Sequence, residues 1–306
     1  AYIETMAKAD VLVLDKTGTI TEGKPHVVSY KAYGEYDPNR LYALVKSSIH
    51  PVSRGIERYL KEHYENLKEV PLEKVKQVQA RGITAEIGGH TLLGGNAKMM
   101  REFGIDVDEE SEYTLFCFAV DGKVVARFEL RDLPKQGAKE AIEEIREQGI
   151  DIIMLTGDNE KAAARVAEEV GVPRFKAGLF PEEKAKEIDI LHAEGHVVIM
   201  AGDGINDALA LSKSDIAIAM GSGSDVALEV SDVVLLDDRI ASLRDAFLIS
   251  RRTYKFVKQN LALSVIYNSI TIPLAVAGYV IPLVAALSMS LSSLLVVGNS
   301  MRIKSR

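Results

Sequence analysis

Short, mostly β-branched apolar runs alternate with amphipathic helical stretches along much of this 306-residue chain. Several runs are apolar without interruption, which is typical of parallel strands covered on both faces. Alternating strands and helices predict a doubly wound α/β fold, and such folds place their chemistry at the carboxyl ends of the strands. The expected strands are residues 11–14, 152–155, 197–201, 216–219 and 233–236, separated by helices such as residues 135–148 and 160–169.

The alternation is interrupted between residues 24 and 128. A helical segment near residues 41–60 is followed there by strand-like pieces that contain many glycines. We interpret this stretch as an inserted α+β domain, so that the α/β domain is discontinuous. The expected division is 1–23 and 129–244 for the α/β domain, 24–128 for the insert, and 245–306 for a C-terminal helical part.

Four polar segments, most of them directly after an expected strand, carry the candidate chemistry. They are Asp15-Lys16-Thr17-Gly18-Thr19, Thr156-Gly157-Asp158, Lys184, and Gly202-Asp203-Gly204-Ile205-Asn206-Asp207. Neighbouring parallel strands end side by side, so we expect these groups to share one crevice. Asp15, Asp203 and Asp207 would concentrate negative charge there, which favours a hard cation such as Mg²⁺. A carboxylate nucleophile, Mg²⁺, a lysine and hydroxyl or amide donors are the parts that phosphoryl transfer needs.

The first of these segments resembles the phosphorylation motif of P-type ATPases, which are members of the haloacid-dehalogenase-like superfamily. The later segments resemble that family's later motifs, in the same order. The resemblance implies that Asp15 becomes an aspartyl phosphate and that Asp203 and Asp207 serve the magnesium site. It also implies a catalytic set of Asp15, Lys16, Thr17, Thr156, Gly157, Asp158 and Lys184, and magnesium ligation by Asp15, Thr17, Asp203 and Asp207.

The residue two positions after the nucleophile separates classes within this superfamily. Soluble phosphatases of this kind carry an Asp there as general acid and base, whereas this chain has Thr17. A threonine hydroxyl does not do that work near neutral pH, so a long-lived phosphoenzyme and a pump are favoured. A membrane-anchored phosphatase remains the alternative. A non-catalytic nucleotide-binding regulator is disfavoured because Asp15, Lys184 and Asp203 are all present.

The inserted stretch carries elements that resemble the nucleotide site of heavy-metal pumps. Ser48-Ile49-His50-Pro51 resembles their histidine–proline motif, which implies that His50, beside Pro51, helps to orient ATP. Gly82 fits the second glycine of the family's Gly-x-Gly loop, where Ala80 stands in place of the first. Gly95-Asn96 resembles the Gly-Asn element that follows. The resemblance therefore implies that ATP binds to the insert.

The stretch from Leu261 to Met301 contains no Asp, Glu, Lys or Arg. One membrane span needs ~20 apolar residues, so this stretch predicts a hairpin of two spans, residues 261–280 and 281–301. Basic residues flank both outer ends, which places these ends in the cytoplasm by the positive-inside rule. They are Arg251, Arg252, Lys255, Lys258, Arg302, Lys304 and Arg306.

Polar and sulfur-containing side chains recur within the expected spans. Tyr267-Asn268 in the first span, with Met289 and Ser292-Ser293 in the second, resemble the last two spans of copper(I)-transporting P-type ATPases. The resemblance implies that Tyr267, Asn268, Met289 and Ser292 line the path of the transported ion. The Met289 thioether is a soft ligand suited to Cu(I), and the spans offer no carboxylate for a harder dication.

The net charge and the cysteine content exclude some kinds of partner and crosslink. The net charge of −7 disfavours a nucleic-acid partner, and the single Cys117 excludes an internal disulfide. The expected partners are ATP, Mg²⁺, a lipid membrane and Cu(I), which a copper chaperone would deliver. The chain begins at Ala1 rather than Met, and we expect it to be the catalytic and C-terminal part of a longer Cu(I)-transporting ATPase. Its expected location is the cell membrane, with the ATP-handling domains in the cytoplasm.

Overall fold

The computed structural model describes residues 2–79, 81–108, 111–204, 206–221, 225–279 and 281–303. The chain divides into two compact units. One unit, Asp10–Ser242, contains two β-sheets, and the other joins Ala1–Ala9 to Leu243–Arg306 and is helical. Each unit is described separately below.

The first sheet is entirely parallel, with the strand order β12-β11-β10-β1-β8-β9. Its central strand β1 has β8 and β9 on one side and β10, β11 and β12 on the other. This arrangement confirms the predicted doubly wound α/β fold and places the strand-order switch beside β1. The strands are β1 (Val11–Asp15), β8 (Asp151–Leu155), β9 (Arg174–Lys176), β10 (Val198–Gly202), β11 (Ile216–Ala219) and β12 (Val233–Val234).

Helices cover both faces of this sheet. On one face, α7 (Pro181–Ala193) and α8 (Ala208–Lys213) share a core with Val11 and Val13. Alternate residues of a strand point to opposite faces, so Leu12 and Leu14 lie on the other face, and both are fully buried. Burial on both sides explains the unbroken apolar run of β1. The remaining helices of this part are α5 (Ala138–Glu147), α6 (Glu160–Val170) and α9 (Asp225–Val230).

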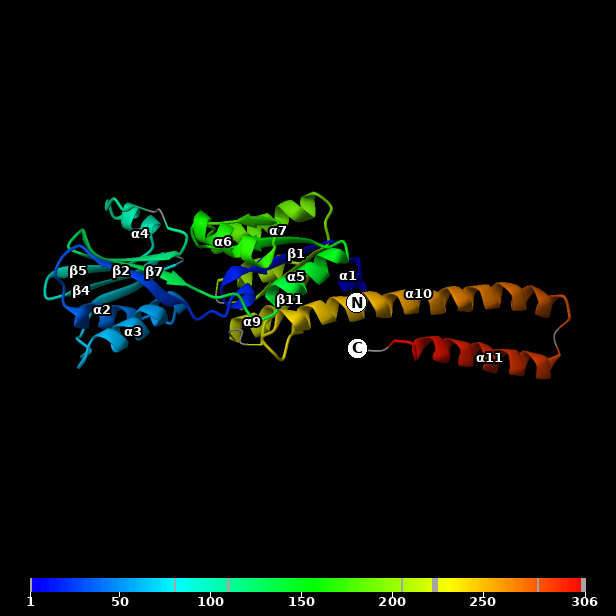
Figure 1. Cartoon of the computed structure of the whole chain (residues 1–306). Coiled ribbons are helices and arrows are strands. Elements are labelled where there is room, and N and C mark those ends of the chain that lie inside the picture. The colour runs from blue at the N-terminus through cyan, green and yellow to red at the C-terminus, as the bar shows by residue number, and fades with distance from the viewer. Residues whose placement is uncertain are drawn as a thin grey trace. The chain divides into compact units, whose positions relative to one another are not determined.

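The second sheet is antiparallel, has the order β2-β7-β6-β5-β4-β3, and lies between β1 and β8 in the sequence. Its helices α2 and α3 cover one face, and α4 lies on the other (Figure 1). The expected boundary at residue 128 falls inside β7, and the division into domains remains a prediction. The elements are β2 (His26–Ala32), α2 (Pro38–Lys46), α3 (Pro51–His63), β3 (Glu73–Val78), β4 (Gly82–Ile87), β5 (His90–Gly95), α4 (Ala97–Glu102), β6 (Thr114–Val120) and β7 (Lys123–Arg131).

The helical unit consists of α1 (Tyr2–Lys8), α10 (Ile240–Val276, which begins just before the unit) and α11 (Pro282–Ser300). The Ser250 hydroxyl lies 3.0 Å from Met6 Sδ, and the Arg251 guanidinium donates to the Ala9 carbonyl at 3.3 Å. These contacts hold the first residues of the chain against α10. The assignment of residues 1–23 to the α/β domain remains a prediction.

The helices α10 and α11 run side by side as a hairpin (Figure 1). Among the described residues, α11 is the helix that is long and apolar enough to cross a membrane, judged by length and composition alone. The helix α10 ends at Val276, before the expected limit at residue 280. Polar contacts join the two helices: Tyr267 Oη and Ser288 Oγ share a hydrogen bond of 2.5 Å, and Asn260 Nδ2 donates to Ser300 Oγ at 2.8 Å.

Candidate active site

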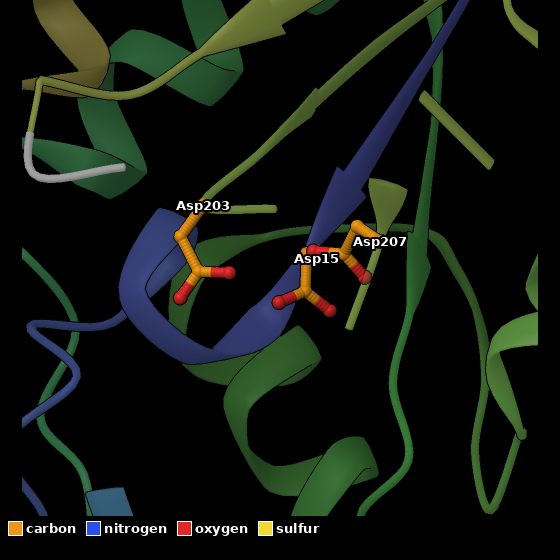
Figure 2. Close-up of side chains that lie close together, drawn as sticks. All are labelled: Asp15, Asp203 and Asp207. Carbon is orange, nitrogen blue, oxygen red and sulfur yellow. The ribbon is translucent and has the colours of Figure 1, made fainter. Parts of the chain in front are cut away.

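Three carboxylates meet at the carboxyl ends of β1 and β10. Asp15 ends β1, Asp203 follows β10, and Asp207 precedes α8. One oxygen from each lies within 4.8 Å of the others. Figure 2 shows Asp15 and Asp207 side by side, with the Asp203 carboxylate turned toward Asp15. The structure thus brings together the three residues that the sequence placed at one crevice.

The Lys184 ammonium bridges two of these carboxylates. Its Nζ donates to Asp15 Oδ1 and to Asp207 Oδ1, each at 2.7 Å. Burial works against the charge on Lys184, but the Asp15 and Asp207 carboxylates outweigh it and raise the pKa of the ammonium. Lys184 therefore carries a positive charge near neutral pH. It lies in the first turn of α7, so the helix start directs it at the end of β1.

The environment of Asp207 disfavours its charged form. Desolvation and then the nearby Asp15 carboxylate raise its pKa to about 7, although Lys184 acts in the opposite direction. Its Oδ2 is buried and has no hydrogen-bond partner among the described residues. An orphaned carboxylate oxygen beside two more carboxylates is the donor set that a hard cation prefers, so the residues present fit Mg²⁺.

The turn η1 (Lys16–Ile20) carries the rest of the first motif past these carboxylates. Gly18 adopts a φ of +75°, and a Cβ atom at this position would lie 2.7 Å from Asp203 Oδ2. The backbone conformation therefore favours glycine, and a Cβ atom would have to displace the Asp203 carboxylate. Thr17, half-buried, directly precedes it. The buried Thr19 hydroxyl has no hydrogen-bond partner among the described residues.

The Thr156-Gly157-Asp158 segment contacts the residue after the nucleophile. Lys16 Nζ donates to Asp158 Oδ2 at 2.7 Å, and the Asp158 amide donates to Thr156 Oγ1 at 3.1 Å. Burial opposes the charge on Lys16, yet Asp158 more than compensates and raises the pKa of Lys16. A Cβ atom on Gly157 would lie 3.2 Å from the Leu179 carbonyl, so this turn packs closely under the loop before α7.

Two residues that sequence reasoning missed hold the nucleophile turn from the end of β7. Lys135 Nζ donates to the Gly18 carbonyl at 2.8 Å. The buried Asp132 carboxylate accepts from the Thr21 hydroxyl at 2.5 Å and from the amides of Gly23 and Lys24. The signal that could have revealed them is the polar Asp-x-Pro-Lys run directly after the alternating residues that form β7.

The second sheet brings Gly82, Gly95 and Asn96 together. Gly82 pairs with Gly95 across β4 and β5. A Cβ atom on Gly82 would lie 2.1 Å from the Gly94 carbonyl, so the two strands approach as only glycine allows. The Asn96 amide donates to the Arg81 carbonyl at 2.9 Å. We call these three residues the glycine cradle; Ala80, the expected first loop position, lies outside the described residues.

His50 and Pro51 lie on another element, at the start of α3. Pro51 is the first residue of the helix, and His50 Nδ1 caps it by accepting from the Val52 amide at 3.3 Å. Desolvation first and the Lys16 ammonium second lower the pKa of His50, while Asp158 acts against them. The ring is exposed to solvent, and because Nδ1 accepts from the Val52 amide, Nε2 is the nitrogen that can meet a ligand.

The four residues expected along the ion path differ in their exposure in this hairpin. Tyr267 is half-buried against Ser288 of α11, and Ser292 is half-buried one turn further along. Asn268 and Met289 are exposed, with Met289 at 65%. Their common path remains a prediction. Lys304 and Arg306 of the expected basic flank lie outside the described residues.

Comparison with known proteins gives close relatives over the whole chain. A copper-exporting P-type ATPase of Staphylococcus haemolyticus (strain JCSC1435) is 39% identical over 313 residues, which cover 99% of this chain and 39% of that protein. One of Bacillus subtilis (strain 168) is 35% identical, with the same coverage of 99% and 39%. The chain thus spans about two fifths of the length of these relatives. They confirm the resemblance to heavy-metal P-type ATPases that the motifs indicated.

Solved structures agree with this result. One match is the catalytic domain of the CPx-ATPase CopB-B, from a structure of its conformational changes upon nucleotide binding. The TM-score is 0.71 and the identity 26%, over 80% of this chain and 91% of that one. A zinc-transporting PIB-type ATPase in its E2.Pi state matches with a TM-score of 0.67 and 29% identity over 98% of this chain and 51% of that one. The model of the haloacid dehalogenase-like hydrolases matches residues 9–215, which contain all three carboxylates and Lys184. On this match, the chain belongs to the haloacid dehalogenase-like hydrolase family.

Proposed function

We propose that this chain is the catalytic and C-terminal part of an ATP-driven heavy-metal pump that works through an aspartyl phosphate. The observation that carries the proposal is the Lys184 ammonium, held 2.7 Å from both Asp15 and Asp207 where Asp203 completes a cation site. Relatives named copper-exporting P-type ATPases match 99% of the chain. Because the chain covers 39% of their length, transport is a property of the longer protein.

Asp15 is the nucleophile in this proposal. Lys184 holds its Oδ1, which leaves the other carboxylate oxygen to attack the terminal phosphorus of ATP. The new bond joins Asp15 to the phosphoryl group, the bond to the bridging oxygen breaks, and ADP leaves with the electron pair. Lys184, Thr17 and Thr156 neutralise and hold the phosphoryl oxygens. The ion pair between Lys16 and Asp158, with Gly157 in the same turn as Asp158, fixes the backbone on both sides of the phosphoryl group.

The cation site has a defined place in this reaction. Asp15, Asp203, Asp207 and the Thr17 carbonyl would hold Mg²⁺. When bound, it supplies charge neutralisation for the phosphoryl oxygens. Without it, these carboxylates repel one another. Desolvation is the largest cause of the raised pKa of Asp207, and repulsion by Asp15 is the next.

The phosphatase alternative has less support. Hydrolysis in that class needs an acidic residue two positions after the nucleophile, and the structure has the half-buried Thr17 there, beside Gly18. Without a general base at this position the phosphoenzyme persists. A pump needs such persistence so that phosphorylation can be coupled to movement elsewhere.

ATP binding is assigned to the second sheet. We propose that the glycine cradle approaches the nucleotide through its backbone and that His50, next to Pro51, orients it. The supporting observations are the close approach of Gly82 to Gly95 and the exposed His50 ring, whose Nδ1 accepts from the Val52 amide. With Nδ1 accepting from that amide, Nε2–H is the group that can donate to a nucleotide.

The transported ion is proposed to be Cu(I). The relatives named above support copper, and Met289 offers a soft thioether on α11. We propose that Tyr267, Asn268, Met289 and Ser292 contribute to its path together with the missing N-terminal part of the pump. In this proposal the α10–α11 hairpin lies in the cell membrane, the ATP-handling sheets lie in the cytoplasm, and a copper chaperone delivers the ion.

Labelling by ATP tests the proposal directly. The chain would be incubated with γ-labelled ATP and Mg²⁺ and quenched in acid, and an acyl phosphate would survive acid but be released by hydroxylamine. Asp15→Asn should abolish the label. Asp189→Asn, which changes an exposed carboxylate paired with Lys213, is the control and should label fully. A label that persists in Asp15→Asn would refute the assignment.

A further inference from the structure

One carboxylate oxygen joins the inserted sheet to the nucleophile turn. Asp158 Oδ2 accepts from Lys16 Nζ at 2.7 Å and also from the Thr114 hydroxyl at 2.5 Å. Lys16 follows the nucleophile Asp15 directly, whereas Thr114 is the first residue of β6 in the other sheet. The Asp158 side chain is only 11% exposed, so the two donors to Oδ2 are not easily replaced by water.

The strand that Thr114 begins leads straight to the glycine cradle. Cys117 of β6 pairs with Gly95, and Gly95 pairs with Gly82. A strand rises about 3.3 Å per residue, so Thr114 lies roughly 10 Å along β6 from the cradle register. The β6 side chains between these points are buried, and a slip by one residue would turn them to the opposite face. The strand therefore connects the two sites with a fixed length and register.

Neighbouring contacts fix the start of β6 against the residues that follow Asp158. Asn159 Nδ2 donates to the Tyr113 carbonyl at 2.7 Å, and the Arg165 guanidinium lies 4.4 Å from the centre of the Tyr113 ring. Arg81 and Lys98 add contacts to Phe180 and Gly178 elsewhere between the two sheets. Removal of one hydroxyl would therefore leave the sheets attached, and would remove only the contact that reaches the charged pair.

We propose that Thr114 is a positioning residue that aligns ATP on the inserted sheet with Asp15, through its hydrogen bond to the Asp158–Lys16 pair. The inference rests on the proposed function, because it assumes that ATP binds at the glycine cradle and phosphorylates Asp15. Thr114 does not touch the reacting atoms. Its effect is on the distance and angle at which the terminal phosphate meets the nucleophile, to which phosphoryl transfer is sensitive.

Two phosphoryl donors separate alignment from simple support of the turn. ATP must be held by the inserted sheet, whereas acetyl phosphate lacks a nucleotide and reaches Asp15 without the cradle, losing acetate as its P–O bond breaks. Phosphoenzyme formation from each donor would be timed in the full chain, with Mg²⁺, for Thr114→Val, Thr114→Ser and the wild type. Thr91→Val, on an exposed residue of the adjacent strand β5, is the matched control.

Thr114→Val should lower the ratio of the ATP rate to the acetyl phosphate rate about tenfold, because it loses a hydrogen bond to a charged partner. Thr114→Ser keeps the hydroxyl and should restore the ratio, and Thr91→Val should leave it unchanged. Partial unfolding would lower both rates by the same factor and so would leave their ratio unchanged. If Thr114→Val does not fold, Thr114→Ala, assayed at low temperature, takes its place. Equal slowing with both donors, or an unchanged ratio, would overturn the inference. Failure of the wild type to label with either donor would refute the proposed function instead.

Discussion

Gly18 lies so close to Asp203 that a Cβ atom at position 18 would be 2.7 Å from Asp203 Oδ2. Gly18→Ala should therefore displace this carboxylate and strain a turn whose φ is +75°. We expect at least tenfold weaker activation by Mg²⁺ in the labelling assay, measured as the Mg²⁺ concentration that gives half-maximal phosphoenzyme. Gly34→Ala is the control, because a Cβ there meets its nearest neighbour at 4.0 Å. Equal Mg²⁺ dependence in both variants would contradict this role of Gly18.

Lys184→Met should destabilise the metal-free protein. It leaves Asp15 and Asp207 buried without the cation that bridges them, and removal of one partner of a buried ion pair costs about 3–5 kcal/mol. Urea unfolding should show this loss, and added Mg²⁺ should recover part of it by supplying positive charge. The control is Lys213→Met, which breaks an exposed pair with Asp189. A loss no larger than that of the control would argue against a buried charge cluster.

The raised pKa of Asp207, about 7 against an ordinary value near 3.8, predicts the direction of a pH effect in the metal-free protein. Between these two values the folded protein binds the proton more tightly than the unfolded chain. The Asp207 contribution to stability is therefore fully present below about pH 4 and is lost as the pH rises toward 7.

Asp207→Asn should reduce that slope, as measured by thermal unfolding between pH 4 and 8 in the presence of a chelator. Added Mg²⁺ should stabilise the unmutated protein more at pH 8 than at pH 6, because it competes with the proton. Asp189→Asn is again the matched exposed variant. A Mg²⁺ effect that is independent of pH would show that Asp207 does not titrate in this range.

Gly95→Ala tests the glycine cradle without introducing strain from a positive φ. A Cβ atom at this position would lie 2.3 Å from the Arg81 carbonyl and 2.5 Å from Met99 Sδ. Its insertion must push β4 and β5 apart, so we expect ATP affinity to fall at least tenfold by calorimetric titration. Labelling from acetyl phosphate should be preserved, which distinguishes a local effect from loss of the fold. Unchanged ATP affinity would place the nucleotide elsewhere.

The proposed ion is tested in a pump of the relatives' full length that contains this chain. Cu(I) should stimulate ATP hydrolysis more than Zn²⁺ does, because the hairpin offers a thioether and no carboxylate. Met289→Ala should weaken the stimulation severalfold, whereas Met301→Ala, beyond the end of α11, should not. Stimulation by Zn²⁺ alone would show that the ion has been misassigned even if Asp15 is phosphorylated.

The parts of the site that could be predicted lie where a buried strand ends. Asp15 and Asp203 stand at an abrupt change from apolar to polar sequence, and parallel pairing then dictates that they meet. Thr114 gave no such signal, because its partner is set by how the inserted sheet folds back onto the segment after β8. In the sequence, Thr114 is recognisable only as the first residue of a strand with alternating side chains.

The helical unit shows a different limit. The uncharged stretch after Leu261 predicted two spans, whereas among the described helices α11 alone is long and apolar enough to cross a membrane, and α10 ends at Val276. The packing of Met6 against Ser250 depends on two segments at opposite ends of the chain, and a seven-residue helix carries too little pattern to reveal its neighbour.

The central place of β1 has a consequence for synthesis of the protein on the ribosome. Val11 pairs with Asp151 and with Val198, so the strand that carries Asp15 has no partner in its sheet until about half of the 306 residues have been made, and its second partner follows later still. The antiparallel sheet between them ends at Arg131, and we expect it to fold first, because domains fold as units as they emerge. Limited proteolysis of stalled nascent chains would reveal that order. A chain interrupted before Asp203 would then contain the nucleophile and a folded antiparallel sheet but no site at which the two could act.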